Sequence, residues 1–377
     1  MRSASGTVAR KTAWHRAVAS RTRLLAGLVT VLLVDPARAA EPFSVFELPG
    51  PGRVVTADIA DLDGDGRSDI WALSIYGVPP DSRRELRIHF QRQDGSFADT
   101  PDWTGSAVDS AAAYDIADLP DGPGEELLLL RRDRVSVLSF AGRKLATRDL
   151  VIPGDPTIAA APDERGLDRY RLMREEVGPN LLVPGLGELI VLTPAGEVLS
   201  RPEVGARANY FIPHRPGPLV GESEIESYFD FAHIEIGDAN GDGRGDLIAS
   251  TRHELRVFQQ REGGGFPQEA DQTLAFRRLD ETDQIRGSGN VRMTTGDFDG
   301  DGRADLLVTS TTGGLLNARS ETSFHLNREG TWNLAQPDGS FVVEGGWSSL
   351  QLIDLDGDGR PELAEARVAL TILEIVE

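Results

Sequence analysis

Short stretches in which apolar and polar residues alternate recur along most of the chain. Residues 54–59, 85–90 and 254–258 are examples, and alternation with a period of two is typical of strands that bury one face. Turn residues such as Asp94-Gly95 and Asp338-Gly339 close many of these stretches. No stretch after residue 39 keeps a helical period. The pattern therefore predicts an all-β protein.

An acidic motif of nine residues separates pairs of predicted strands at a nearly constant spacing. Intact copies begin at Asp61, Asp238, Asp297 and Asp354, a decayed copy begins at Asp118, and a weaker one begins near Leu172. The average period is about 59 residues, and four strands repeated at a fixed period are typical of propeller blades. We therefore predict a β-propeller with six blades.

Closure of the predicted ring decides the blade count. Only 23 residues follow Asp354, which is too few for a blade of four strands. We expect the early strand 43–48 to pair with the C-terminal strands, which would complete the last blade and remove exposed edges. Seven blades are the alternative and would need about 59 more residues. The longest gap holds only an insertion, Gly205–Ser227.

The motif has acids at positions 1, 3, 5 and 9 and glycines at positions 4 and 6. A tight curl at the glycines would bring the carboxylates to one point, where they repel one another unless a cation binds. Oxygen ligands in a flexible loop favour Ca²⁺ over Mg²⁺. We expect position 7 to contribute its backbone carbonyl while its arginine side chain points to solvent. About four Ca²⁺ sites are predicted. Their ligands are Asp61, Asp63, Asp65, Arg67, Asp69, Asp238, Asn240, Asp242, Arg244, Asp246, Asp297, Asp299, Asp301, Arg303, Asp305, Asp354, Asp356, Asp358, Arg360 and Glu362.

Two alternatives compete with this interpretation of the loops. A helix–loop–helix calcium motif needs a Glu at position 12 and flanking helices. Only the last loop has that residue, Glu365, and the flanks are predicted strands, so we reject this motif. A solvated acidic turn is the other alternative, and four copies at a fixed period count against it. In the decayed copy Pro120 and Gly122 replace two ligands, so we expect no metal there.

The first 39 residues differ in charge from the remainder. They hold seven of the 39 basic residues and one of the 60 acidic residues, so residues 40–377 carry a net charge of −27. The apolar stretch Leu24–Val34 is short for a bilayer span, and Ala37-Arg38-Ala39 fits a cleavage site. We predict a signal peptide over 1–39 and a single propeller domain over 40–377. An uncleaved membrane anchor is the alternative.

Charge and cysteine content narrow the environment and the partners. A body this acidic does not attract nucleic acid or anionic membranes by its field. The chain has no cysteine, and an exported protein without disulfides can gain stability from bound metal. We expect a periplasmic or extracellular monomer with no membrane span in the mature chain.

The acidic loops between strands resemble the FG-GAP repeats of the integrin α-chain propeller, and still more the bacterial FG-GAP/VCBS-type repeat proteins. The resemblance covers nearly all of residues 40–377 and is strongest in the first, fourth, fifth and sixth units. It implies calcium loops between the first two strands of a blade and a partner on the opposite face or along the rim. The seven blades usual in that family differ from the six counted here.

We expect a non-catalytic, calcium-stabilised binding module for a protein or a glycan. The alternative is a secreted carbohydrate-active enzyme, because some polysaccharide lyases resemble this repeat class. The sequence contains no nucleophile elbow, zinc-protease motif or phosphate-binding loop. The histidines after residue 39 fall in different units and are His89, His214, His233, His253 and His325.

The insertion is the irregular part of the repeat array. It contains residues 209–215, in which aromatic side chains adjoin an arginine. A long loop on a rigid scaffold suits contact with a glycan or a peptide. Packing of its aromatic residues against the ring is the alternative.

Fused to a reporter, residues 1–39 should direct export and be removed, because a basic, then apolar, then small-residue pattern is that of a secretory signal. Mass spectrometry of the exported protein should find Ala40 at its N-terminus. Recovery of a product that still contains residues 24–34 would contradict this prediction.

Overall fold

The computed structural model describes residues 46–50, 52–78, 81–106, 108–120, 122–154, 165–211, 226–251, 254–275, 290–312, 319–344, 346–357 and 360–369. The predicted signal peptide and its cleavage site lie outside these ranges, so both remain predictions. Within the described ranges, no helix is long and apolar enough to cross a bilayer.

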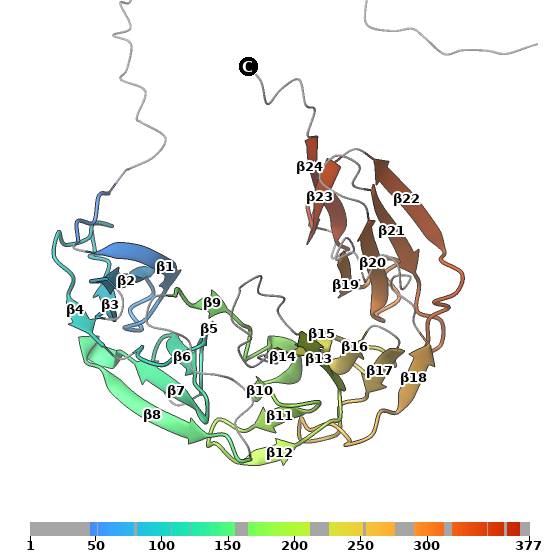
Figure 1. Ribbon diagram of the computed structural model, residues 1–377, viewed down its shortest axis with the longest axis horizontal. Helices are drawn as coiled ribbons and strands as arrows, with labels where there is room; N and C mark the ends of the chain where they lie inside the picture. Colours follow the sequence, from blue (N-terminus) through green and yellow to red (C-terminus); the bar gives the residue numbers. More distant parts are fainter. Residues whose placement is uncertain are drawn as a thin grey trace, which may run out of the picture. The chain divides into compact units, whose positions relative to one another are not determined.

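The regular structure of the described residues is β, as the alternating pattern predicted (Figure 1). Two short 3-10 helices, η1 (Ala141–Arg143) and η2 (Glu175–Val177), are the exceptions in this part of the chain. The strands are β1 (Arg53–Ala60), β2 (Asp69–Tyr76), β3 (Arg83–His89), β4 (Trp103–Gly105), β5 (Ala113–Ala117), β6 (Glu126–Leu130), β7 (Arg134–Ser139), β8 (Ala146–Val151), β9 (Asp168–Arg169), β10 (Leu181–Pro184), β11 (Leu189–Leu192), β12 (Val198–Ser200), β13 (Ala206–Phe211), β14 (Glu226–Phe231), β15 (His233–Gly237), β16 (Asp246–Ser250), β17 (Glu254–Phe258), β18 (Gln272–Ala275), β19 (Asn290–Gly296), β20 (Asp305–Thr312), β21 (Arg319–His325), β22 (Gly339–Glu344), β23 (Gly346–Ile353) and β24 (Glu362–Ala369).

Each repeat of the sequence corresponds to one sheet whose strands follow chain order. The first sheet is β1–β4, the fourth is β15–β18 and the fifth is β19–β22, each with four antiparallel strands. The third sheet has three strands (β10–β12), and the last sheet has two (β23–β24). In the second sheet (β5–β9) the short strand β9 lies parallel to β5 and adds a fifth strand.

The acidic motifs join the first two strands of their sheets, as the resemblance implied. The residue before each motif pairs with the ninth residue of the motif. These pairs are Ala60↔Asp69, Ala117↔Glu126, Gly237↔Asp246, Gly296↔Asp305 and Ile353↔Glu362. The decayed motif therefore keeps the register of the intact ones. The weak copy near Leu172 does not, because Met173 there bridges to Leu181.

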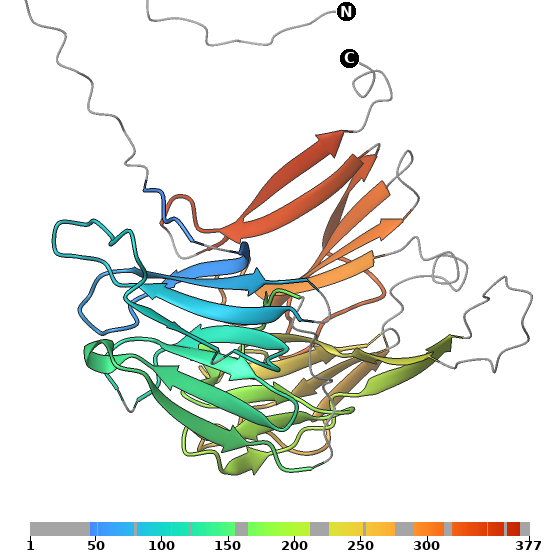
Figure 2. The same ribbon diagram turned by 60° about the vertical axis from the view of Figure 1, so that its left-hand side comes forward.

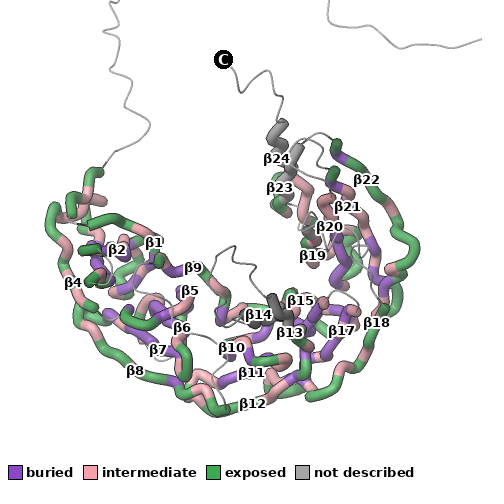
Figure 3. Tube along the Cα trace, in the orientation of Figure 1, coloured by how far each residue is buried: buried purple, intermediate pink, exposed green. Residues whose placement is uncertain are grey.

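Burial is greatest in the middle strands of each sheet. All five residues of β6 and of β16 are buried. The outer strand β8, by contrast, is mostly exposed (Figure 3). A continuous apolar run such as Leu127–Leu130 fits a strand with both faces covered. The middle strands therefore form the cores between sheets, and the loops at their ends remain open to solvent.

Consecutive sheets pack through shared apolar cores. Trp71 and Leu86 of the first sheet pack with Leu127 and Phe140 of the second. Three further cores join the second sheet to the third, the third to the fourth and the fourth to the fifth. Strands β21 and β23 bring the fifth and last sheets into contact. Neighbouring repeats thus stabilise one another, as expected for units that cannot bury a sheet face alone.

The predicted closing strand is not found in the described part of the chain. Residues 46–48 belong to no strand, and the last sheet consists of β23 and β24. Alternation alone predicted this strand, but a strand also needs a neighbouring strand to pair with, which alternation does not identify. Residues 43–45 and 370–377 lie outside the description. The count of six blades therefore remains a prediction.

The insertion predicted at Gly205–Ser227 begins and ends as a β-hairpin. Strands β13 and β14 pair from Ala206↔Phe231 to Phe211↔Glu226, so the element extends four residues beyond its predicted end (Figure 2). The strand preference of its aromatic residues explains the difference. Residues 212–225 lie outside the described ranges, and His214 and Arg215 with them.

Candidate metal centres

The backbone of the acidic loops is curled as the glycines predicted. Gly64 and Gly66 have φ values of 76° and 80°, and the glycines at the same positions of the next two intact loops are also left-handed. This region is strained for residues with a Cβ. The curl turns three backbone N–H groups toward the first acid. Gly64 and Asp65 donate to Asp61 Oδ1 at 2.9 and 3.0 Å, and Gly66 donates to Asp61 Oδ2 at 2.8 Å.

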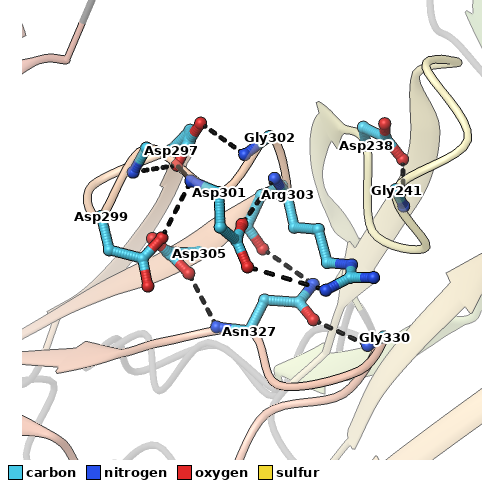
Figure 4. Close-up of polar contacts among 12 residues, drawn as sticks. Asp238, Gly241, Asp297, Asp299, Asp301, Gly302, Arg303, Asp305, Asn327 and Gly330 are labelled. Carbon is cyan, nitrogen blue, oxygen red and sulfur yellow. Dashed lines mark hydrogen bonds and ion pairs between the residues drawn. The ribbon is translucent and has the colours of Figure 1, made fainter.

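The acid at position 9 is buried and ties three segments of its sheet together. Asp305 is fully buried, and its Oδ2 accepts the N–H of Phe298 at 2.8 Å. Its Oδ1 accepts the N–H of Asn327, beyond the end of β21, at 2.7 Å (Figure 4). The same paired bonds recur at Asp69 and Asp246. One carboxylate therefore joins the loop, the second strand and the end of the third strand.

Burial makes the charged form of these position-9 acids costly. It raises the pKa of Asp69 and of Asp246 from the usual 3.8 to about 6. Burial also raises the pKa of Asp305. The backbone N–H bonds oppose the shift, whereas nearby acids, such as Asp63 beside Asp69, reinforce it. A bound cation would relieve this cost, because it favours the ionised carboxylate.

Three loops bring the acids at positions 1, 3 and 9 together. In each, one ligand atom from every member lies within 4.8 Å of the others. The groups are Asp61, Asp63 and Asp69; Asp297, Asp299 and Asp305; and Asp354, Asp356 and Glu362. Three converging carboxylates can hold a cation. The loop at Asp238 has the same backbone bonds but Asn240 at position 3, so it offers an amide oxygen instead.

The first loop contains a buried acceptor atom that a bound cation could satisfy. The side chain of Asp63 is only 5% exposed, yet its Oδ1 has no hydrogen-bond partner within the described residues. A buried carboxylate oxygen without a partner is costly. A cation at the acidic group would satisfy it, so the residues present fit a bound metal ion.

Position 5 lies apart from the three converging acids, and its role as a metal ligand stays a prediction. Asp65 and Asp301 are not members of the converging groups found among the described residues. Each instead pairs with the arginine two residues later: Asp65 with Arg67, and Asp301 with Arg303 at 3.6 Å (Figure 4). Asp358 lies outside the described ranges.

The arginines at position 7 fold back on the loops rather than simply pointing to solvent, which corrects the prediction. Arg244 pairs with Asp242 at 2.5 Å and donates to the carbonyl of Gln260. Arg303 also lies against the preceding loop, where a Cβ on Gly241 would come within 2.9 Å of its Nε. Opposite charge two residues away attracts these side chains, a local effect that the periodicity did not reveal.

The decayed loop keeps the structural bond and loses the acidic group. Glu126 at its ninth position is buried, and its Oε2 accepts the N–H of Leu119 at 2.9 Å. Glu125 links this loop to the first one, since its N–H donates to the Asp61 carbonyl at 2.7 Å. Pro120 and Gly122 stand where ligands are found elsewhere, and Asp121 lies outside the described ranges.

Sequence reasoning missed a second recurrent acid. Asp102, Asp271 and Asp338 each accept the backbone N–H twelve residues earlier, at 2.7 to 2.9 Å. Each of them lies directly before the fourth strand of its sheet. The signal was present in the sequence as an acid at a fixed place in three units. It was hidden because the neighbouring residues vary.

The described histidines lie in separate sheets, as predicted. His89 is buried in β3 and contacts the carbonyl of Ala98, and His325 is buried in β21 beside the carbonyl of Asn333. His233 in β15 contacts Glu235 at 2.8 Å. His253 lies outside the described ranges.

Comparison with known proteins identifies the repeat. A family model described as an FG-GAP-like repeat matches residues 238–308 and 297–364, which confirms the resemblance in the last three units. No curated protein matches the chain. Among 70 matching chains of solved structures is one of the Photorhabdus luminescens Tc holotoxin pore, with a TM-score of 0.25 and 13% identity. The match covers 78% of this chain and spans 16% of that one.

Substituting Glu126→Ala should lower the free energy of unfolding by about 1–3 kcal/mol, because the buried N–H of Leu119 loses its acceptor. Urea denaturation of the metal-free protein measures this. Asp118→Ala is the matched control, since Asp118 is exposed in the same loop and should change stability by no more than about 0.5 kcal/mol. Equal effects of the two substitutions would contradict a structural role for position 9.

Proposed function

Because this chain is an FG-GAP repeat protein, we propose that it is an exported, calcium-stabilised β-propeller that binds a protein or a glycan without catalysing a reaction. The unpartnered Oδ1 of Asp63 within the first acidic group carries the metal part of this proposal. The aromatic residues of the β13–β14 hairpin support the binding part. Each part is tested by its own experiment below.

Calcium suits the donor set of the acidic loops. Carboxylate oxygens at positions 1, 3 and 9 are hard ligands, and Asn240 supplies an amide oxygen in the loop at Asp238. The proposed ligands are those predicted from the sequence, including the backbone carbonyl at position 7. A bound Ca²⁺ would neutralise part of the charge that the folded loops concentrate. It would thereby stabilise a chain that has no cysteine.

A propeller of six blades is the architecture that these units support best. Five loops share one register, and consecutive sheets share cores in chain order. Residues 40–377 would form this single domain after removal of a signal peptide over 1–39. The basic start of the chain and the apolar stretch Leu24–Val34 that follows it support export to the periplasm or beyond.

The hairpin of β13 and β14 is the proposed contact element. The sequence of its two strands contains Tyr210, Phe229 and Phe231, and Phe231 is 46% exposed. Aromatic residues supply large contact areas for glycans and peptides at little entropic cost. A hairpin outside the four-stranded sheets can carry such a surface without changing the cores.

Asp299→Ala should remove one calcium site and lower the melting temperature in calcium, because it deletes the third-position ligand of an intact loop. Each site stabilises the fold by about 2.7 kcal/mol when calcium exceeds its Kd a hundredfold. Calcium titration by calorimetry, paired with thermal melts, measures both effects. Asp121→Ala in the decayed loop is the control and should change stability by less than about 0.5 kcal/mol. Equal losses from both substitutions, or no calcium dependence in the wild type, would refute the metal assignment.

Deleting residues 207–230 should leave the fold intact and abolish partner binding. Ala206 and Phe231 are register partners, so a two-residue Asn-Gly turn can bridge them. Thermal melting tests the fold, and a glycan array and a pull-down with calcium or chelator test binding. Loss of the cooperative transition would make the hairpin structural, and unchanged binding would place the partner elsewhere.

A further inference from the structure

We propose that Arg143, which belongs to the second sheet, is a positioning residue of the first acidic loop. It holds the Asp63 carboxylate so that Oδ1 faces the acidic group, and it thereby couples calcium binding in that loop to the contact between the first two sheets. The inference rests on the proposed calcium function and concerns how one site is built.

The contact between the two sheets is direct. Arg143 ends η1, which lies between β7 and β8, and its Nε donates to Asp63 Oδ2 at 2.8 Å. Its Nη2 lies 3.6 Å from Asp65 Oδ2. Asp63 and Arg143 are eighty positions apart in the chain. Only the packing of the second sheet on the first therefore brings this guanidinium to the loop.

Arg143 is held in place by its own surroundings. Its backbone is left-handed, with φ at 64°, in a turn that follows Gly142 at 60°. Such a conformation is uncommon for arginine. The guanidinium carbon lies 5.0 Å from the centre of the Phe90 ring, close enough for a cation–π contact. The donor is thus fixed from two sides.

The two oxygens of the Asp63 carboxylate differ in their contacts. Oδ2 is taken by Arg143, whereas the buried Oδ1 has no partner in the described part of the chain. A residue that fixes a ligand through its second oxygen restricts the ligand to one orientation. The arginine charge opposes a nearby cation, but the Arg143 side chain is 43% exposed and water screens it. Screening by water does not remove the hydrogen bond that orients the buried Asp63 carboxylate.

The first loop differs here from the loops at Asp297 and Asp238. Asp299, at the same position of the loop at Asp297, has no arginine partner among the described residues and accepts only the N–H of Asp301 at 3.2 Å. The loop at Asp238 has Asn240 at this position. Removing the Arg143 side chain should therefore affect one site and leave the others unchanged.

Arg143→Asn is the test variant, because asparagine tolerates a left-handed backbone and cannot reach Asp63 in the same way. Calorimetric titration of the mature protein with Ca²⁺ should show one site weakened roughly 10–100-fold, the usual range for a residue that orients a ligand. Arg143→Lys, which keeps the charge without the guanidinium geometry, should be intermediate. Arg134→Gln is the control, since Arg134 lies on β7 and pairs with Asp133 and Asp149.

Asp63→Ala identifies the site by a double-mutant cycle. In that background Arg143→Asn should cause no further loss of calcium affinity, because the carboxylate it positions is gone. Urea denaturation in chelator measures the separate cost of losing the Arg143–Asp63 ion pair, and a lower midpoint there with unchanged calcium affinity would make Arg143 a purely structural residue. Unchanged affinity, tighter binding, or additive losses would overturn the role of Arg143 while leaving the calcium sites intact. Absence of calcium binding in the wild type would overturn the proposed function and this inference together.

Discussion

The carboxylate at the ninth position, which is buried in four of the five loops that share the register, makes the interaction on which the repeat depends. It closes the turn by accepting the N–H of the second loop residue and, in three sheets, also accepts an N–H beyond the third strand. A shorter or longer loop would break this bond and shift the strand register by a residue, which would turn the buried face of the next strand outward. The constant register of five loops follows from it.

This constraint also creates the chemistry of the loops. Holding the ninth acid in place leaves the first and third acids facing it, so the fold concentrates negative charge that water alone would disperse. Arginines at position 7 offset part of this charge by pairing with position 5. The acids at positions 1, 3 and 9 keep their negative charge, which a divalent cation would neutralise. Structure and proposed metal binding therefore have a common origin in one turn.

The second loop separates the two roles of the motif. Its ninth position is Glu126, which keeps the structural bond, while proline and glycine occupy positions where ligands stand elsewhere. The bond recurs in five sheets, where it closes the turn between the first two strands. A bound ion is needed only where acids are held together. Loss of ligands in one unit is therefore tolerated when neighbouring sheets supply the packing, as the shared core of Leu127 and Trp71 does here.

Much of the molecule could be predicted from local pattern. Alternation predicted the strands, the fixed period predicted one sheet per repeat, and Gly64 and Gly66 predicted the tight curl, because each depends on residues close together in the chain. The closing strand at 43–48 was not found in the described part, since a strand also needs a partner that alternation does not name. The sequence did not show that the acids at positions 1, 3 and 9 converge while the fifth acid pairs with an arginine, as Asp65 does with Arg67, because the spacing treats all four acids alike. Tertiary structure alone brought Arg143 to Asp63, since contacts between sheets join residues eighty positions apart, and no local pattern encodes that distance.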